Sequence, residues 1–319
     1  MDARAPSHVA GTSAVLAAAS LWGISGVVAK SLFAESVSPE VLVAVRLGGA
    51  AAAAVAYTAL FRPPALRAAW RRRRQVALLG MCLASTQFAY YAAIASASVA
   101  TAIFLQYLAP ALLVLWARVA EGEPLTSGRI AAVGLAWGGA FLLVVGPRGL
   151  VVTPHGLGWG LASAVLFAAY TVLAREEVAR SDSWGVLALA LTVGAVSWSA
   201  LVPPWDAWLR PYTGTQWLRF AHLSLLATVL PFGLFLYGLR VIPPARAGLL
   251  ATVEPVVAAA AAYLVLGEHL TTVQALGGIF ILAAVAWAHR EGLRKLRGTG
   301  ADTRSVRRAA GGFPPPRPM

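Results

Sequence analysis

Ten long apolar runs occupy most of this chain, and no other feature limits its fold so strongly. A helix that crosses a membrane needs about 20 mostly apolar residues, because the hydrocarbon core is about 30 Å thick and a helix rises about 1.5 Å per residue. The runs cover residues 9–30, 39–61, 75–96, 98–117, 128–146, 156–174, 184–203, 217–239, 245–266 and 271–289. The pattern predicts an all-α integral membrane protein with ten transmembrane helices.

The third and fourth runs are poorly separated. Only small residues lie between them, from Ser96 to Thr101. Read as one helix, the two runs would be about 40 residues long, which is too long for a single crossing even with tilt. We therefore expect a break at this point.

The composition excludes several classes of soluble protein. Hydrophobic residues make up 59% of the 319 residues, charged residues make up 12%, and the mean hydropathy is +0.70. An ordinary soluble domain carries about 25% charged residues, so this chain lacks the charge to cover a soluble surface. A soluble enzyme, a nucleic-acid-binding protein and a disordered chain are therefore poor interpretations.

The basic residues gather on one side of the predicted membrane. With the N-terminus inside, 21 of the 26 lysine and arginine residues fall in inside segments, 4 fall outside, and Arg46 lies within the second run. Cytoplasmic loops of membrane proteins carry such an excess. We therefore expect a multi-pass protein of the inner cell membrane with both termini in the cytoplasm. The lipid bilayer then accounts for the net charge of +13 without a nucleic-acid partner.

Two parts of the chain match each other at a constant offset of 145 residues. The recurring positions are Leu105, Pro110, Gly122, Glu123, Leu125 and Thr126, matched by Leu250, Pro255, Gly267, Glu268, Leu270 and Thr271. The match predicts two five-helix repeats, residues 1–148 and 149–290, followed by a disordered, basic, proline-rich cytoplasmic tail at 291–319. Because five is odd, the second repeat enters the membrane from the opposite side. Secondary transporters often enclose a central cavity between such inverted repeats, although a duplicated scaffold without transport would show the same pattern.

These residues also resemble a known family. The Trp22-Gly23 pair, Arg46 and the paired proline and Gly-Glu-x-Leu-Thr blocks resemble the EamA-type transporters of the drug/metabolite transporter superfamily. The resemblance covers residues 10–290. It implies ten helices in an inverted repeat around a central cavity, with both termini cytoplasmic and with export of small metabolites, often amino acids or related compounds.

Glu254 is the carboxylate placed well inside a predicted span. An acid at that depth is costly unless it is paired, protonated or exposed to a water-filled cavity. One interpretation is a group that couples a proton or binds a substrate amine. The other is a permanently protonated acid that donates one hydrogen bond between helices.

Arg46 lies within the second span, toward its outer side. Facing the cavity, it would bind a substrate carboxylate or pair with Glu254, and the two charges together would suit a zwitterion such as an amino acid. Alternatively, its long side chain extends to the membrane interface.

Further candidates for substrate contact are polar or aromatic residues within spans. Pro110 and Pro255 each interrupt a span, and a proline inside a helix frees the carbonyl four residues earlier, which becomes an acceptor where it lines a cavity. Packing in the protein interior is the alternative for each of these residues. The polar and aromatic candidates are Trp22, Gln87, Tyr90, Gln106, Tyr107 and Tyr170.

The sequence as a whole predicts a secondary transporter that exports small organic metabolites by alternating access, with proton coupling as one option. The chain has no Walker A or G-x-S-x-G motif, and its five histidines show no metal-ligand spacing, so we expect no enzyme activity, cofactor or metal. The alternatives are an intramembrane enzyme acting on lipid-like substrates and a non-transporting membrane scaffold. A homodimer is one option for the oligomeric state.

Overall fold

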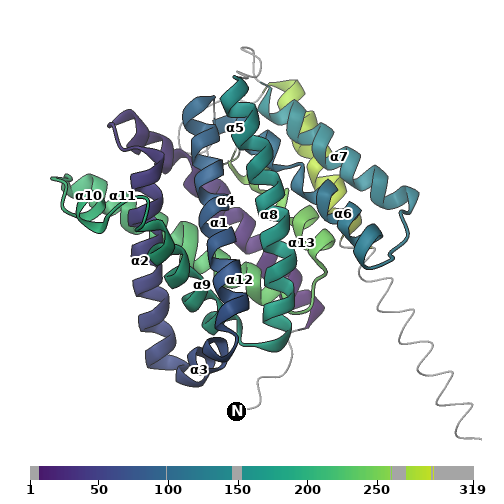
Figure 1. Cartoon of the computed structure of the whole chain (residues 1–319). Coiled ribbons are helices and arrows are strands. Elements are labelled where there is room, and N and C mark those ends of the chain that lie inside the picture. Colours follow the sequence, from purple (N-terminus) through teal and green to yellow (C-terminus); the bar gives the residue numbers. More distant parts are fainter. Residues whose placement is uncertain are drawn as a thin grey trace, which may run out of the picture.

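The computed structural model describes residues 7–97, 99–145, 153–258, 260, 271–288 and 290. Helices form nearly all of this part of the chain, which contains no strand. Three predicted features lie outside the described residues. They are the segment that follows the fifth predicted span at 146–149, most of the repeated block at 267–271, and the tail at 291–319. Figure 1 shows the helices side by side in one bundle.

Six of the predicted spans correspond to single helices. These are α1 (His8–Ala34), α2 (Pro39–Phe61), α4 (Arg73–Ser96), α7 (Ser127–Val144), α8 (Pro154–Arg180) and α9 (Ser183–Trp198). Among the described residues, five segments are long and apolar enough to cross a membrane: Pro39–Phe61, Arg73–Ser96, Thr101–Ala120, Pro154–Arg180 and Gly214–Leu239. The fold is therefore that of an all-helical membrane protein, and the count of ten crossings stays a prediction.

Polar side chains between the apolar runs begin several of these helices. Ser38, Thr126, Thr153 and Asp182 each accept a hydrogen bond from a backbone N–H in the first turn of the helix that follows. The first N–H groups of a helix have no partner within it, and such a cap supplies one. The helix starts thus follow the polar residues that separate the predicted spans.

Two short helices lie between predicted spans. Pro63 and Pro64 are the first residues of α3 (Pro63–Arg71), and Pro203 caps α10 (Pro204–Trp208), which begins at Pro204. Proline is favourable there because its missing N–H would have no partner within the helix anyway.

Two spans are interrupted at equivalent places. The chain leaves α4 at Ser96, as expected, and continues as α5 (Val99–Gln106) and α6 (Ala109–Ala120), with a turn at residues 107–108. In the second half, α13 (Pro244–Ala251) ends before a turn at 252–253, and helix resumes at residue 254. Each turn ends two residues before Pro110 or Pro255, whose rings prevent regular helical hydrogen bonding. The two breaks are 145 residues apart.

A third span contains a widened turn. It consists of α11 (Gly214–Ser224), the π-helix η1 (Leu225–Val229) and α12 (Leu230–Leu239). Pro231 is the second residue of α12 and has no N–H to offer the carbonyl of Ala227, four residues earlier. Single π-turns inside helices are often found at functional sites.

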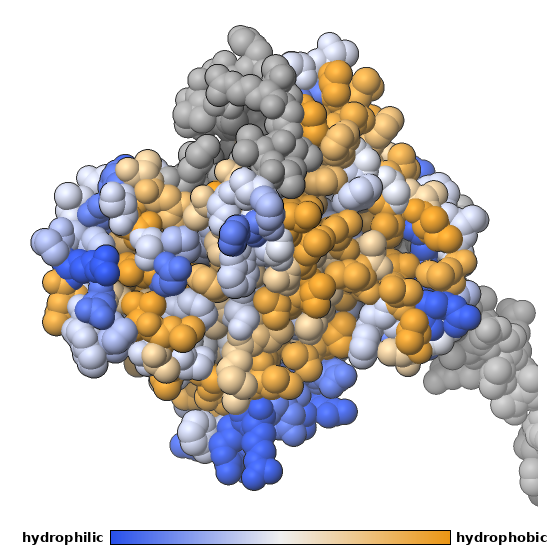
Figure 2. Space-filling model, turned by 45° about the horizontal axis from the view of Figure 1, so that its top comes forward, coloured by the Kyte–Doolittle hydropathy of each residue, from blue (hydrophilic) through white to orange (hydrophobic). Residues whose placement is uncertain are grey.

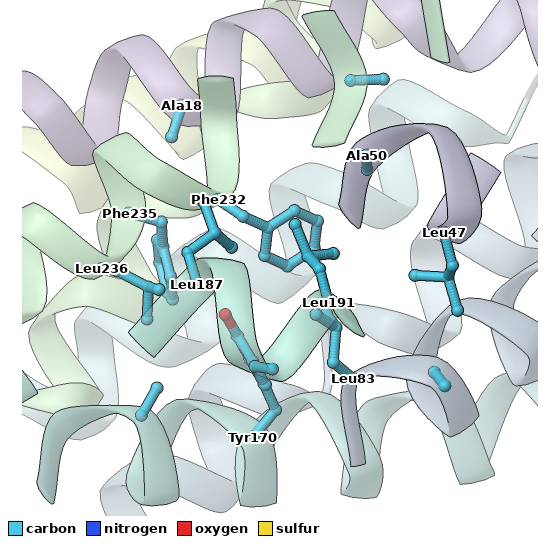
Figure 3. Packing of buried hydrophobic residues seen from close by; sticks show 14 of the residues in the cluster. Ala18, Leu47, Ala50, Leu83, Tyr170, Leu187, Leu191, Phe232, Phe235 and Leu236 are labelled. Atoms are coloured by element: carbon cyan, nitrogen blue, oxygen red, sulfur yellow. The ribbon is translucent and has the colours of Figure 1, made fainter. Parts of the chain in front are cut away.

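The two halves pack together through equivalent helix pairs. In one pair α4 contacts α8, and in the other α12 contacts α1, so the third span of each half lies against the first span of the other. Gly11 and Gly238 allow α1 and α12 to approach closely. Figure 3 shows the adjoining core, in which Tyr170, Phe232 and Phe235 lie among leucine and alanine side chains.

The outer surface suits a lipid environment. Large hydrophobic side chains are exposed on many helices, including Leu60 at 75% and Val119 at 77%. Figure 2 shows apolar residues over much of the viewed surface, with hydrophilic residues gathered at its lower edge and sides. A soluble protein does not usually expose so much contiguous apolar area.

Candidate functional site

A cavity lies at the centre of the bundle, where the broken helices meet the first and third spans of both halves. Its volume, measured as the space open to the centres of water-sized molecules, is about 80 Å³. Its polar lining comes from α1, α2, α4, the turn after α5 and the helix that resumes at residue 254. The lining residues include Trp22, Ser25, Arg46, Thr86, Gln87, Tyr90, Tyr91, Gln106, Tyr107, Ala109, Pro110, Phe167, Ala227, Phe232, Ala251 and Glu254.

Equivalent positions of the two halves line this cavity in pairs. The pairs separated by 145 residues are Trp22 with Phe167, Gln87 with Phe232, Gln106 with Ala251, and Ala109 with Glu254. The rings of Trp22 and Phe167 meet edge to face, with their centroids 6.3 Å apart. The backbone frame is thus duplicated across the cavity, whereas the chemistry of the paired side chains differs.

Arg46 points from α2 into the centre of the bundle and is only 4% exposed. Its Nε donates to Thr228 Oγ1 at 2.5 Å, its Nη2 donates to the Ala227 carbonyl at 2.6 Å, and its Nη1 donates to the Tyr91 hydroxyl. A longer contact of 3.4 Å joins Nη1 to Gln87 Oε1. All of these acceptors are neutral, so the positive charge is buried with hydrogen bonds but with no carboxylate among the described residues.

The Ala227 carbonyl is available to Arg46 because of the local helix geometry. Pro231 cannot donate to it, and the π-helix η1 widens the turn at this point. The Thr228 hydroxyl donates in turn to the Leu223 carbonyl, five residues back, at 2.7 Å. The guanidinium group therefore joins the second span of one half to the opened turn in the other half.

Glu254 occupies the first helical position after the break in the ninth span. Gly23 lies against its backbone, since a β-carbon at Gly23 would be 2.5 Å from the Glu254 carbonyl oxygen. The Tyr107 hydroxyl interacts with the Glu254 carboxyl group, although the two do not reach the geometry of a full hydrogen bond. Arg46 and Glu254 both line the cavity, and the described hydrogen bonds of Arg46 do not include Glu254; of the two roles considered for an Arg46 that faces the cavity, pairing with Glu254 is therefore not the one seen.

Two buried polar atoms in the cavity wall have no hydrogen-bond partner among the residues that the structure describes. They are Nε2 of Gln87 and the hydroxyl oxygen of Tyr107. A buried polar group without a partner costs about 1–3 kcal/mol. Both side chains can donate a hydrogen bond.

The structure brings most of the predicted site residues together. Those that line the cavity are Trp22, Arg46, Gln87, Tyr90, Gln106, Tyr107, Glu254 and Pro110. Tyr170 instead lies in the adjoining core, where its ring contacts Phe167 and Phe232, and its hydroxyl has no hydrogen-bond partner (Figure 3). Pro255 is absent from the lining, although Ala251, whose carbonyl it frees, is part of it.

Several contributors were not found from the sequence. Ser25 follows Trp22 by three residues on α1, so helical spacing alone would place it on the same face. Tyr91 differs from the others, because its spacing of four residues from Gln87 on one helix face is visible in the sequence; it binds Arg46. Thr228 and Ala227 carry no sequence signal except Pro231, which follows them closely in the chain.

Each half of the chain matches a known protein family. The model of the EamA-like transporter family matches residues 9–145 and residues 154–289. This chain belongs to the EamA-like transporter family. It is accordingly a membrane transporter built from two related halves.

Relatives and a solved structure agree with this assignment. The uncharacterized inner membrane transporter YicL of Salmonella typhimurium is 28% identical over 89% of this chain and 96% of its own length. The threonine/homoserine exporter RhtA of the same species is 27% identical over 80% of this chain and 83% of its own length. One crystal structure has a TM-score of 0.76 with 22% identity, covering 90% of this chain and 99% of the other, and it supports the fold.

Proposed function

We propose that this protein is a secondary transporter that exports small zwitterionic metabolites, such as amino acids, across the inner membrane by alternating access. One observation carries the proposal: the buried Arg46 charge lines the cavity with no carboxylate partner in the described part of the chain, while Glu254 of the other half lines the same cavity. A zwitterion supplies the complement of both groups.

The Arg46 end of the cavity is suited to a substrate carboxylate. A buried charge without an opposite charge is unfavourable, and a carboxylate next to the guanidinium group relieves that cost. The unpartnered Nε2 of Gln87 lies beside the same group and adds a donor for the second carboxylate oxygen. Burial strengthens such charge-assisted hydrogen bonds because water competes with them less.

The Glu254 end is suited to the substrate amine. Glu254 and the Tyr107 hydroxyl lie together at the two equivalent helix breaks. An ionised Glu254 binds an ammonium group, and a protonated Glu254 releases it, so proton uptake at this residue would couple a proton to export. The cavity lining also contains three aromatic rings, those of Trp22, Phe167 and Phe232. These rings favour a substrate with an apolar portion.

The orientation in the membrane is part of the proposal. The excess of arginine in alternate loops supports cytoplasmic N- and C-termini. A reporter that is active only in the cytoplasm, fused to the C-terminus, gives a signal if this orientation is right. A silent reporter on a well-expressed fusion would reverse it.

Flux measurements in reconstituted vesicles test the function. The wild-type protein should exchange at least one of threonine, homoserine and a panel of other amino acids. Arg46→Gln should lower kcat/KM about 100-fold for zwitterions, because a charge-assisted contact of about 3 kcal/mol is lost. Wild-type vesicles without flux for any zwitterion, or full activity in Arg46→Gln, would overturn the proposal.

A second comparison tests the coupling. Glu254→Gln should abolish accumulation driven by a pH gradient while retaining some exchange between unlabelled and labelled substrate. Tyr170→Phe is the matched control, because Tyr170 is buried nearby without lining the cavity. Flux that ignores the imposed gradient in the wild type would remove the proton role of Glu254 and leave substrate binding intact.

A further inference from the structure

Two ion pairs join the halves of the protein at opposite ends of the bundle. Glu35, at the end of α1, pairs with Arg219 on α11. Arg72, which precedes α4, pairs with Glu177 near the end of α8. We call the first end the Glu35 face and the second the Glu177 face.

The two faces are separated by a full helix length. α2 begins four residues after Glu35 and runs for 23 residues, about 34 Å at 1.5 Å per residue. Only α3 then intervenes before Arg72. The pairs therefore close the two ends of the same bundle, with the cavity between them.

The two pairs are related by the internal repeat. Glu35 and Glu177 are 142 residues apart, and Arg72 and Arg219 are 147 apart, close to the repeat offset of 145. Each pair connects the end of a first span in one half to the start of a third span in the other. The same two helix combinations, α1 with α11 and α12, and α8 with α4, form the equivalent contacts between the halves.

From this relationship we propose that the two ion pairs are the alternating gates of the transporter. Opening the cavity to the Glu35 face separates α1 from α11 and breaks Glu35–Arg219, and opening it to the Glu177 face separates α8 from α4 and breaks Arg72–Glu177. The proposal rests on alternating access as the proposed function. In this structure both pairs are formed, so both gates are closed.

The gates differ in strength. Glu177 is 4% exposed and Arg72 25%, and two hydrogen bonds of 2.7 and 2.8 Å join them. Glu35 and Arg219 are 41% and 29% exposed and share one contact. Exposed pairs contribute little, whereas breaking a buried pair is costly. The cavity should therefore open more readily to the Glu35 face.

Thiol labelling from each side of the membrane tests the gates without substrate. The native cysteine is removed as Cys82→Ala, and Ala29→Cys places one thiol in the cavity wall. A membrane-impermeant maleimide is then applied to either face of oriented vesicles. In this background, labelling should be faster from the Glu35 face.

Charge removal at each gate should change one face. Glu35→Gln should raise the labelling rate from the Glu35 face about two- to fivefold, because an exposed pair is lost. Glu177→Gln should raise the rate from the Glu177 face by about tenfold or more. Arg72→Lys keeps the charge without the two-pronged contact and should give an intermediate rate, which covers the case that Glu177→Gln does not fold.

Two controls separate gating from general loosening. Arg62→Gln removes another ion pair between the halves, Arg62–Asp182, which joins α2 to α9 and has no counterpart in the repeat. It should leave both labelling rates unchanged. The exchange of charges in Glu35→Arg with Arg219→Glu should restore the original rate at the Glu35 face.

The proposal is overturned if neither Glu35→Gln nor Arg72→Lys changes labelling from its own face, or if Arg62→Gln produces the same change. Because labelling needs no substrate, its result is independent of flux. An inactive wild type with gated labelling refutes the proposed function alone. An active wild type with ungated labelling refutes the gates alone.

Discussion

Arg46 on α2 donates a hydrogen bond to the carbonyl of Ala227 in the other half of the protein, with 2.6 Å between Nη2 and the oxygen. That carbonyl is free because Pro231 offers it no N–H group. A proline in one half thus fixes the position of a charge contributed by the other half.

Replacing that proline should weaken substrate binding. Pro231→Ala supplies an N–H that competes for the Ala227 carbonyl and allows the π-turn to relax to a regular helix. We expect KM for a transported zwitterion to rise about three- to tenfold, because one hydrogen bond to a charged group is weakened. Pro154→Ala, at the first turn of α8, is the control and should leave KM unchanged. An unchanged KM in Pro231→Ala would show that the freed carbonyl does not position Arg46.

Tyr107 and Tyr170 form a matched pair for a hydroxyl deletion. Both are buried and both hydroxyls lack a hydrogen-bond partner, but only Tyr107 lines the cavity. Tyr170→Phe should raise the free energy of unfolding by about 1 kcal/mol, because it removes an unsatisfied polar group, and it should leave flux unchanged. Tyr107→Phe should lower flux severalfold without lowering the melting temperature. Equal effects on flux would contradict the assignment of Tyr107 to the site.

Gly23 should tolerate no side chain. A β-carbon at this position would meet the Glu254 carbonyl oxygen, so Gly23→Ala must push α1 away from the helix that carries Glu254. We expect a loss of about 1–3 kcal/mol in stability and reduced flux. Gly158→Ala on α8 is the control, because no described atom lies within 4 Å of its added β-carbon. It should be neutral or stabilising by up to about 1 kcal/mol. Thermal melting in detergent compares the two variants.

The gate at the Glu35 face should persist at mildly acidic pH. The hydrogen bond from Arg219 lowers the pKa of Glu35 below its usual value of 4.5. A carboxylate with a depressed pKa stabilises the paired state above the unperturbed pKa, and this contribution is lost only as the pH falls through the lowered pKa. Maleimide reacts with the thiolate, whose fraction falls with pH, so the labelling rate from the Glu35 face is divided by the rate in Glu35→Gln at the same pH. This ratio should stay constant from about pH 7.5 to about pH 5.5. A rise within that range would place the pH-sensitive group elsewhere.

Much of the architecture could be predicted because the governing signals are local. Apolar runs, proline breaks and the recurrence at Pro110 and Pro255 are all visible in the sequence. Arg46 and Glu254 were singled out because charged groups are rare inside membranes. The short helices α3 and α10 were missed because paired prolines mark a helix start as well as a turn.

The partners within the site could not be predicted in the same way. Pairing with Glu254 was one of the roles considered for Arg46, but its acceptors among the described residues are neutral groups, two of which lie in the π-turn near Ala227. Tyr170 ends in a hydroxyl group, as Tyr107 does, and lies within a predicted span. Its ring nevertheless packs against Phe232 in the core, and the sequence does not show which way this face of α8 is turned. The ion pairs at the two faces are each formed by residues more than 100 positions apart, so no local pattern reveals them.

The unequal chemistry of equivalent positions has a consequence for how such proteins diversify. Gln87 faces a cavity position whose counterpart is Phe232, and Ala109 has Glu254 as its counterpart. A mutation at one of these positions changes the lining of the cavity and leaves the side chain at the equivalent position of the other half unchanged. New specificities can therefore arise by a few substitutions in one half, while the backbone frame of both halves is retained.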